Sequence, residues 1–204
     1  MSFRQLILAW MLWPASIAAG AEEAKRTWDF EQDTTGQIAQ GFTDEVGAWR
    51  IAEVGNGKIL MQTARNANSV FNITLASDTN AKDVDIAVDM QAIAGKLDQG
   101  GGLVWRASDA KNYYLARYNP LEDNYRLYKV VDGKRTMLED AKITRSDGPH
   151  ALRVTMSGDH IECFFDGKKT HDRHDGTFTG AGKIGLWTKA DAQTQFDNLT
   201  LRGK

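Results

Sequence analysis

The chain has 204 residues, one cysteine and a formal net charge of −2. A single cysteine excludes an intramolecular disulfide. The slightly acidic balance argues against a nucleic acid or an anionic membrane as partner, because both require a basic surface.

Residues 1–21 have the pattern of a signal peptide. Arg4 gives a positive start, an apolar run follows from Leu6 to Trp13, and Ala19-Gly20-Ala21 fits a small-x-small cleavage site. The apolar run is too short to span a bilayer, which needs about 20 residues. We therefore expect a periplasmic or secreted protein without a membrane span. Residues 22–204 are expected to form a single domain with a charge of −3 (24 basic minus 27 acidic residues).

The rest of the chain is dominated by period-two alternation of apolar and polar residues, which indicates β-strands. Asn-Pro, Asp-Gly and Ser-Gly turn signals separate the runs, and this spacing is typical of an all-β sandwich or barrel. The expected strands are 59–63, 69–75, 83–90, 102–107, 113–118, 124–131, 135–139, 151–156, 160–165, 183–188 and 195–201.

The alternation also separates an inner from an outer face. Val84, Ile86 and Val88 share one face of their strand, and aspartates occupy the other. This pattern is typical of antiparallel sheets that pack on one face and contact solvent on the other. We expect two such sheets.

Three segments carry a family resemblance. They are GGGLVWRASDAKNYYLARYNP (100–120), RLYKVVDGKRTML (126–138) and DGKKTHDRHDGTFTGAGKIGLWTKADAQTQFDNLTL (166–201). Together they resemble exported bacterial domains of the concanavalin A-like lectin/glucanase superfamily, closest to the 3-keto-disaccharide hydrolase-like, laminarinase-like domains. The resemblance implies an antiparallel two-sheet jelly roll with a concave groove suited to sugars. It implies no particular activity, since this fold also carries lectins and interaction modules.

The acids of a glucanase are not evident. Laminarinase-type hydrolases of this superfamily use E-x-D-x-(x)-E on a strand, and the nearest match is the run from Asp83 to Asp89, without either glutamate. Asp85 and Asp89 would stand about 13 Å apart, whereas Asp83 and Asp85 would stand about 6.6–7 Å apart. An acid pair is therefore conceivable only for Asp83 and Asp85. A solvated strand face is the simpler interpretation.

A sugar-binding surface is better supported, because several aromatic and arginine side chains fall on neighbouring strands. Flat rings stack on sugar C–H groups, and guanidinium groups donate to hydroxyls or carboxylates. Alternation allows only about half of such residues to face a groove, with the others in the core. We expect the arginines at the surface, since arginine is almost never buried unpaired. The candidate ligand-binding residues are Trp105, Arg106, Tyr113, Arg117, Arg126 and Trp187.

Two further clusters could bind a metal. Asp29 and Asp197 lie near the two ends of the domain, where related sandwiches hold a structural Ca²⁺, although two carboxylates are a partial ligand set. Pairing outward from a two-residue Asp166-Gly167 turn would set His171 opposite Glu162, with His160 diagonal to it. An ion-pair ladder is the expected role of this second cluster, because Arg173 beside it opposes a cation.

The sequence thus predicts an exported carbohydrate-binding β-sandwich that holds a glycan in a concave groove. Two alternatives remain. One is a glycoside or 3-keto-glycoside hydrolase with a nonstandard acid set, which would need convergent carboxylates in the groove. The other is a non-catalytic protein-interaction module, which would show a convex apolar patch instead. No cofactor is expected apart from the possible Ca²⁺.

Overall fold

The computed structural model describes residues 25–203, and the predicted signal peptide at 1–21 lies outside this range. The described residues form fifteen strands and no helix. A membrane-crossing helix is accordingly absent from this part of the chain.

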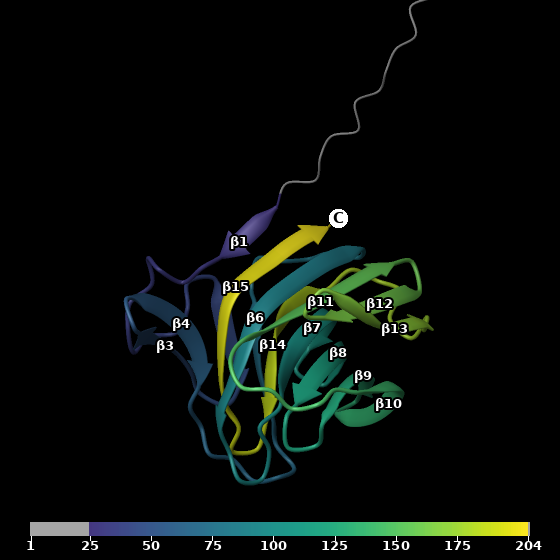
Figure 1. The fold of residues 1–204 in the computed structure, drawn as a ribbon. Helices are drawn as coiled ribbons and strands as arrows, with labels where there is room; N and C mark the ends of the chain where they lie inside the picture. Colours follow the sequence, from purple (N-terminus) through teal and green to yellow (C-terminus); the bar gives the residue numbers. More distant parts are fainter. Residues whose placement is uncertain (1–24, 204) are drawn as a thin grey trace, which may run out of the picture.

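The strands form two antiparallel sheets that stack on each other (Figure 1). In spatial order, the eight-stranded sheet contains β13 (Lys168–His174), β12 (His160–Phe165), β11 (His150–Ser157), β6 (Val84–Ala94), β15 (Gln193–Gly203), β4 (Gly57–Gln62) and β3 (Trp49–Val54), and β1 (Arg26–Trp28) pairs with β15. The seven-stranded sheet contains β10 (Lys134–Lys142), β9 (Asn124–Val131), β8 (Asn112–Asn119), β7 (Gly101–Asp109), β14 (Lys183–Lys189), β5 (Phe71–Ala76) and β2 (Phe42–Val46). The predicted all-β, antiparallel two-sheet architecture is confirmed.

The main core lies between the two sheets and is built by the alternation seen in the sequence. On β6, Val84, Ile86 and Val88 point inward, and on β12 the inward residues include Cys163. The thiol of Cys163 is fully buried, and this burial raises its pKa, so the residue acts as a small apolar side chain rather than a nucleophile.

The seven-stranded sheet also buries apolar residues on its other face, which points away from the eight-stranded sheet. Val104, Tyr113, Leu115, Tyr128 and Trp187 form a second cluster there, separate from the main core. This sheet is therefore packed on both faces. The second face contains the candidate site.

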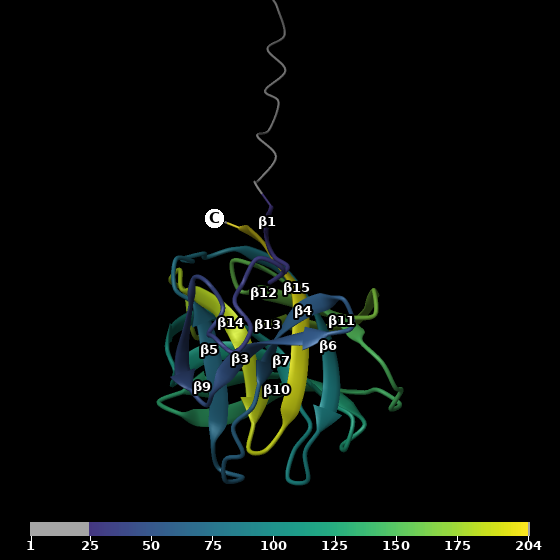
Figure 2. The ribbon, with the colours of Figure 1, turned by 90° about the vertical axis from the view of Figure 1, so that its left-hand side faces the viewer.

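The two ends of the described chain lie close together, because β1 pairs with β15 from Arg26 opposite Leu201 to Trp28 opposite Leu199. Figures 1 and 2 show the C-terminus beside β1 from two directions. At the opposite margin of the sandwich, the edge strands β10 and β13 of the two sheets contact each other.

Candidate functional site

The outer face of the seven-stranded sheet is strongly concave. The guanidinium carbon of Arg135 on β10 lies 5.1 Å from the ring centre of Phe71 on β5. Four strands separate β10 from β5, so a flat sheet would set them about 24 Å apart. An arginine side chain is far shorter than this, and the contact therefore requires the sheet to curl around Arg135.

The floor of this concave face is aromatic. The guanidinium carbon of Arg135 lies 4.4 Å from the ring centre of Tyr128 and 5.6 Å from that of Trp187. Phe71 packs against Trp187, and the indole N–H of Trp187 donates to the Tyr113 hydroxyl at 3.1 Å. Cation–π attraction holds the guanidinium over these rings.

Arg135 has no carboxylate within ion-pair distance among the described residues, and its buried Nη1 has no hydrogen-bond partner. Burial lowers the pKa of its guanidinium, which shows that the environment opposes the charge. Arg135 is partly buried, and N–H donors that leave water without gaining an acceptor are costly. A ligand is a natural source of the missing acceptors.

A polar cluster adjoins the aromatic floor and is organised by Arg117 on β8. Its side chain is fully buried, and Nη2 donates to Glu122 Oε2 at 2.9 Å and to Asn124 Oδ1 at 3.2 Å. Its Nε and Nη1 have no hydrogen-bond partner. Arg117 lies opposite Gly102, which in turn lies opposite Trp187, so a residue without a side chain separates the guanidinium from the indole.

Asp98 lies beside Arg117 and is also buried. Its Oδ2 stands 3.8 Å from Arg117 Nη1 and 3.7 Å from Lys189 Nζ, and both distances exceed a hydrogen bond. Gly100 N donates to Asp98 Oδ1 at 2.6 Å, and a Cβ at Gly100 would lie 2.8 Å from that atom. The glycine thus permits the close approach that positions the carboxylate.

Glu122 completes the cluster. Asn119 Nδ2 donates to Oε1 of Glu122 at 3.1 Å and to Oδ1 of Asp98 at 3.2 Å, which brings the two carboxyl groups together. Burial alone would raise the pKa of Glu122, but the charge of Arg117 and hydrogen bonding by Asn124 lower it overall. Glu122 is therefore held ionised at neutral pH.

The structure divides the six predicted ligand-binding residues into two groups. Tyr113, Arg117, Arg126 and Trp187 all belong to the concave face, and Arg126 bridges Glu122 and Asp140 there. Ligand contact by these four residues stays a prediction.

Trp105 and Arg106 do not face the concave side. Trp105 is fully buried between the sheets, where it stacks on Tyr114. Arg106 is 3% exposed and donates to the backbone carbonyls of Lys82, Phe178 and Gly158.

The expectation of surface arginines is accordingly wrong for Arg106 and Arg117. Both are buried, and neither is unpaired: carbonyls accept from Arg106, and carboxylates accept from Arg117. Arg135 and Asp98 were not among the residues predicted from the sequence. Neither carries a local signal, since their proximity depends on the curvature of the sheet.

Asp85 and Asp89 lie on β6 of the other sheet, Asp83 directly precedes that strand, and the three do not converge in the concave face. Asp85 forms a two-point ion pair with Arg153, and Asp83 accepts from Gly158 N and lies 3.4 Å from Arg106. Asp89 accepts from Asn198. The solvated-face interpretation fits these contacts.

Asp29 and Asp197 do lie near each other. Burial raises the pKa of Asp197, and the charges of Asp89, Glu31 and Asp29 add to this effect. Among the described residues, however, the three-residue group of convergent metal-ligating atoms includes none of these acids. The structural Ca²⁺ therefore remains an untested prediction.

The predicted register of the β12–β13 hairpin is wrong beyond its first two pairs. Asp166 and Gly167 both have positive φ, as a type I′ turn requires, and Phe164 lies opposite Lys169 as expected. A bulge then follows at Thr170, and His171 lies opposite Cys163 instead of Glu162. One extra residue moves every later side chain of β13 to the other face.

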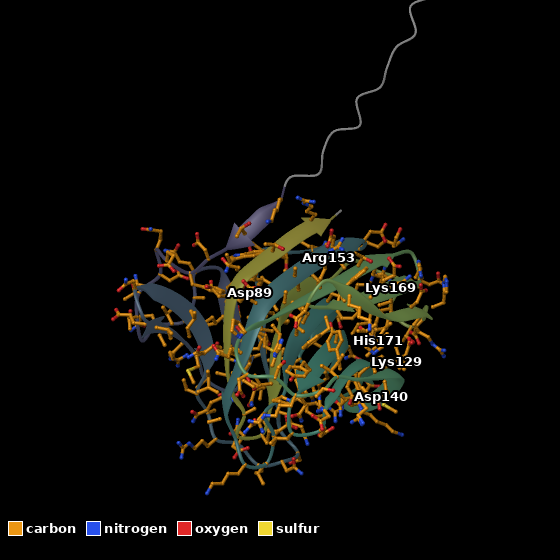
Figure 3. The ribbon with its side chains drawn as sticks, viewed as in Figure 1. Asp89, Lys129, Asp140, Arg153, Lys169 and His171 are labelled. Carbon is orange, nitrogen blue, oxygen red and sulfur yellow. The ribbon has the colours of Figure 1, made fainter. Side chains whose placement is uncertain are left out.

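The bulge places His171 in the core. Its ring packs on Tyr125, and its Nε2 is buried without a hydrogen-bond partner. In Figure 3, His171 lies on β13 where this strand faces β10. Burial lowers the pKa of His171 to about 4, so the ring is neutral at physiological pH.

We expect His171 to make the fold acid-sensitive. The folded-state pKa lies below the unfolded value of about 6.5, so the unfolded chain binds a proton first and stability falls as the pH drops from about 6.5 to about 4. A shift of this size corresponds to about 3 kcal/mol. Urea unfolding at several pH values should show this loss, and His171→Leu should reduce it. If the free energy of unfolding falls equally with pH in the unaltered protein and in His171→Leu, His171 is not the source of the acid sensitivity.

No protein-family model matches the chain. Over 164 residues, or 78% of this chain, the sequence is 27% identical to levanase of Bacillus subtilis strain 168. The match spans 22% of the length of that enzyme, so the chain covers about a fifth of its curated relative.

Solved structures resemble the chain over most of its length. Carbohydrate-binding module CBM66 from Bacillus subtilis superposes with a TM-score of 0.69 and 25% identity over 80% of this chain and 96% of the module. A GH16 protein of Bacteroides ovatus, solved with the product G4G4G3G, gives a TM-score of 0.62 at 10% identity over 86% of this chain and 99% of its own. The fold is that of the concanavalin A-like lectin/glucanase superfamily.

Proposed function

We propose that the protein is a carbohydrate-binding module that holds a glycan in the concave face of the seven-stranded sheet. The observation that carries this proposal is the partly buried guanidinium of Arg135, which lies over the aromatic floor of that face with no hydrogen-bond partner on Nη1. Sugar hydroxyl oxygens are acceptors of the right kind for its N–H donors. The similarity to CBM66 and to part of a levanase supports a sugar ligand.

The site provides complementary groups for a sugar ring. Phe71 offers aromatic surface, Arg135 offers donors, and the partly exposed carboxylate of Glu122 offers acceptors. Trp187, Arg117 and Asp98 are buried beneath these groups and hold them in place. Protein–sugar recognition needs this combination, because each hydroxyl is both donor and acceptor. The levanase similarity makes a fructan the first ligand to test. The signal-peptide pattern at 1–21 leads us to propose that binding takes place outside the cytoplasm.

A hydrolase is less well supported, although Asp98 and Glu122 lie close together. A glycosidase acid must be protonated and therefore needs a raised pKa. The pKa of Glu122 is instead lowered, mainly by Arg117 among its charged neighbours. Asp98 is about 1% exposed, which limits its access to substrate. This pair suits hydrogen bonding better than proton transfer.

The proposal predicts binding without turnover. Affinity electrophoresis in gels that contain levan, inulin or a β-glucan should show retardation by at least one polymer. Incubation with that polymer should release no reducing sugar. If neither these gels nor a broad glycan array with a thermal-shift screen reveals a ligand, carbohydrate binding is refuted. Sugar release that depends on Glu122 would instead establish the hydrolase.

A further inference from the structure

The bulge at Thr170 creates a second cluster of chemically active side chains, which belongs to the eight-stranded sheet and not to the concave face. It sets His174 opposite His160 and Asp172 opposite Glu162. All four side chains then project from the outer face of the eight-stranded sheet, because residues two apart on a strand share a face. The regular register expected from the sequence would have separated them.

Three of these residues already converge. Ligand atoms of His160, Glu162 and Asp172 lie within 4.8 Å of one another. His160 Nε2 lies 2.7 Å from Asp172 Oδ1, and the ring of His174 stacks on that of His160 with 4.6 Å between ring centres. In a tetrahedral site with bonds near 2.0–2.1 Å, ligand atoms are about 3.3–3.5 Å apart. Small rotations of these solvent-accessible side chains would close the difference.

A cationic group already lies between the two carboxylates. Lys169 Nζ lies 3.0 Å from Glu162 Oε1 and 2.7 Å from Asp172 Oδ2. The ammonium of Lys169 thus occupies the position between the two carboxylates that a metal ion would take. The side chain of Lys169 is about half exposed, and exposed ion pairs are weak, so a more highly charged ion could displace it.

From the sequence, the positive charge of Arg173 was expected to oppose a metal ion in this cluster. In the folded protein Arg173 points away from the cluster. Arg173 lies opposite Ile161, whose side chain points into the core, so Arg173 is on the other side of the ribbon from Glu162 and Asp172. A groove of about 230 Å³ borders His160 and Glu162 and extends to Asp85. This groove leaves room for a water molecule on a bound ion.

We infer that His160, Glu162 and Asp172, with His174 within reach as a fourth ligand, form a binding site for a divalent transition metal such as Zn²⁺. Imidazole and carboxylate ligands suit zinc, whereas Ca²⁺ and Mg²⁺ prefer oxygen ligands alone. The ion would link β12 to the edge strand β13 and so stabilise this hairpin. The site is independent of the proposed sugar-binding face.

Zinc binding can be measured with tag-free protein by competition against a chromogenic zinc indicator. We expect one zinc ion per chain and a zinc-dependent rise in Tm. Asp172→Asn should weaken binding about tenfold or more, as loss of a ligand does. Lys169→Met should tighten binding by about tenfold, because it removes the competing ammonium and leaves both carboxylates free. Calcium should not compete.

Asp89→Asn is the matched control, because Asp89 is a partly exposed carboxylate on the same face of the sheet that accepts from Asn198 and does not line the groove beside His160 and Glu162. Its zinc affinity should equal that of the unaltered protein. Urea unfolding of each variant in EDTA shows whether the metal-free variant is folded. A folded variant with weak zinc binding has lost a ligand, whereas an unfolded variant has lost the hairpin itself. Absence of binding by both the unaltered protein and Lys169→Met at millimolar zinc would overturn the inference. Unchanged affinity of a folded Asp172→Asn variant would also overturn it.

Discussion

Arg117→Ala is expected to destabilise the protein by about 3–5 kcal/mol, the usual cost of breaking a buried ion pair by removing one partner. The guanidinium is fully buried between Asp98 and Glu122. Its loss leaves the Asp98 carboxylate buried, with Lys189 Nζ at 3.7 Å as its nearest remaining cation. Urea unfolding followed by tryptophan fluorescence measures this change directly.

Arg126→Ala provides the matched control for this experiment. Arg126 also pairs with Glu122 and additionally with Asp140, but its side chain is 28% exposed. An exposed pair contributes about 0–1 kcal/mol, so this variant should remain close to the unaltered protein in stability. A loss below about 1 kcal/mol for Arg117→Ala would show that Arg117 is not the organising group of the cluster.

Unlike Arg117→Ala, Arg135→Ala is expected to have a large effect on glycan binding and a small effect on the free energy of unfolding. Removal of Arg135 takes away cation–π contacts worth about 0.5–2 kcal/mol, but it also removes a partly buried charge that has no carboxylate partner. Hydrogen bonds from a charged donor are worth about 1.5–3 kcal/mol. Loss of one such bond to a sugar should therefore reduce affinity by roughly 10- to 100-fold.

Two further variants make this test specific. Arg135→Lys keeps the charge but loses the planar pair of donors, and it should recover only part of the affinity. Lys134→Ala removes an exposed charge from the adjacent position on β10 and should bind as the unaltered protein does. Glycan affinity that is retained in Arg135→Ala would place the sugar elsewhere on the molecule.

Much of the fold could be predicted because it depends on local alternation. The alternation from Asp83 to Met90 predicted correctly that the valines and the isoleucine of this run lie in the core. The Asp166-Gly167 turn was also identified correctly, because both residues adopt positive φ. Strands β1 to β3 were missed. β1 and β2 have only three and five residues, which leaves too few positions for a period to show.

The sequence alone determined the class of this protein: an antiparallel β-sandwich whose inward residues follow the pleat of each strand. It could not determine which aromatic side chains face the core and which face the concave side, since both faces of the seven-stranded sheet are packed. Trp105 and Trp187 have similar local patterns, yet the first lies between the sheets and the second in the concave face.

Tertiary structure alone decided which residues make up the two proposed sites, because both depend on contacts between distant or irregularly paired residues. Sheet curvature brings Arg135 of β10 to Phe71 of β5, 64 positions away along the chain (135 − 71). A single extra residue at Thr170 buries His171 and exposes Asp172 beside Glu162. Curvature and bulges arise from packing of the whole sandwich, and alternation within one strand does not specify them.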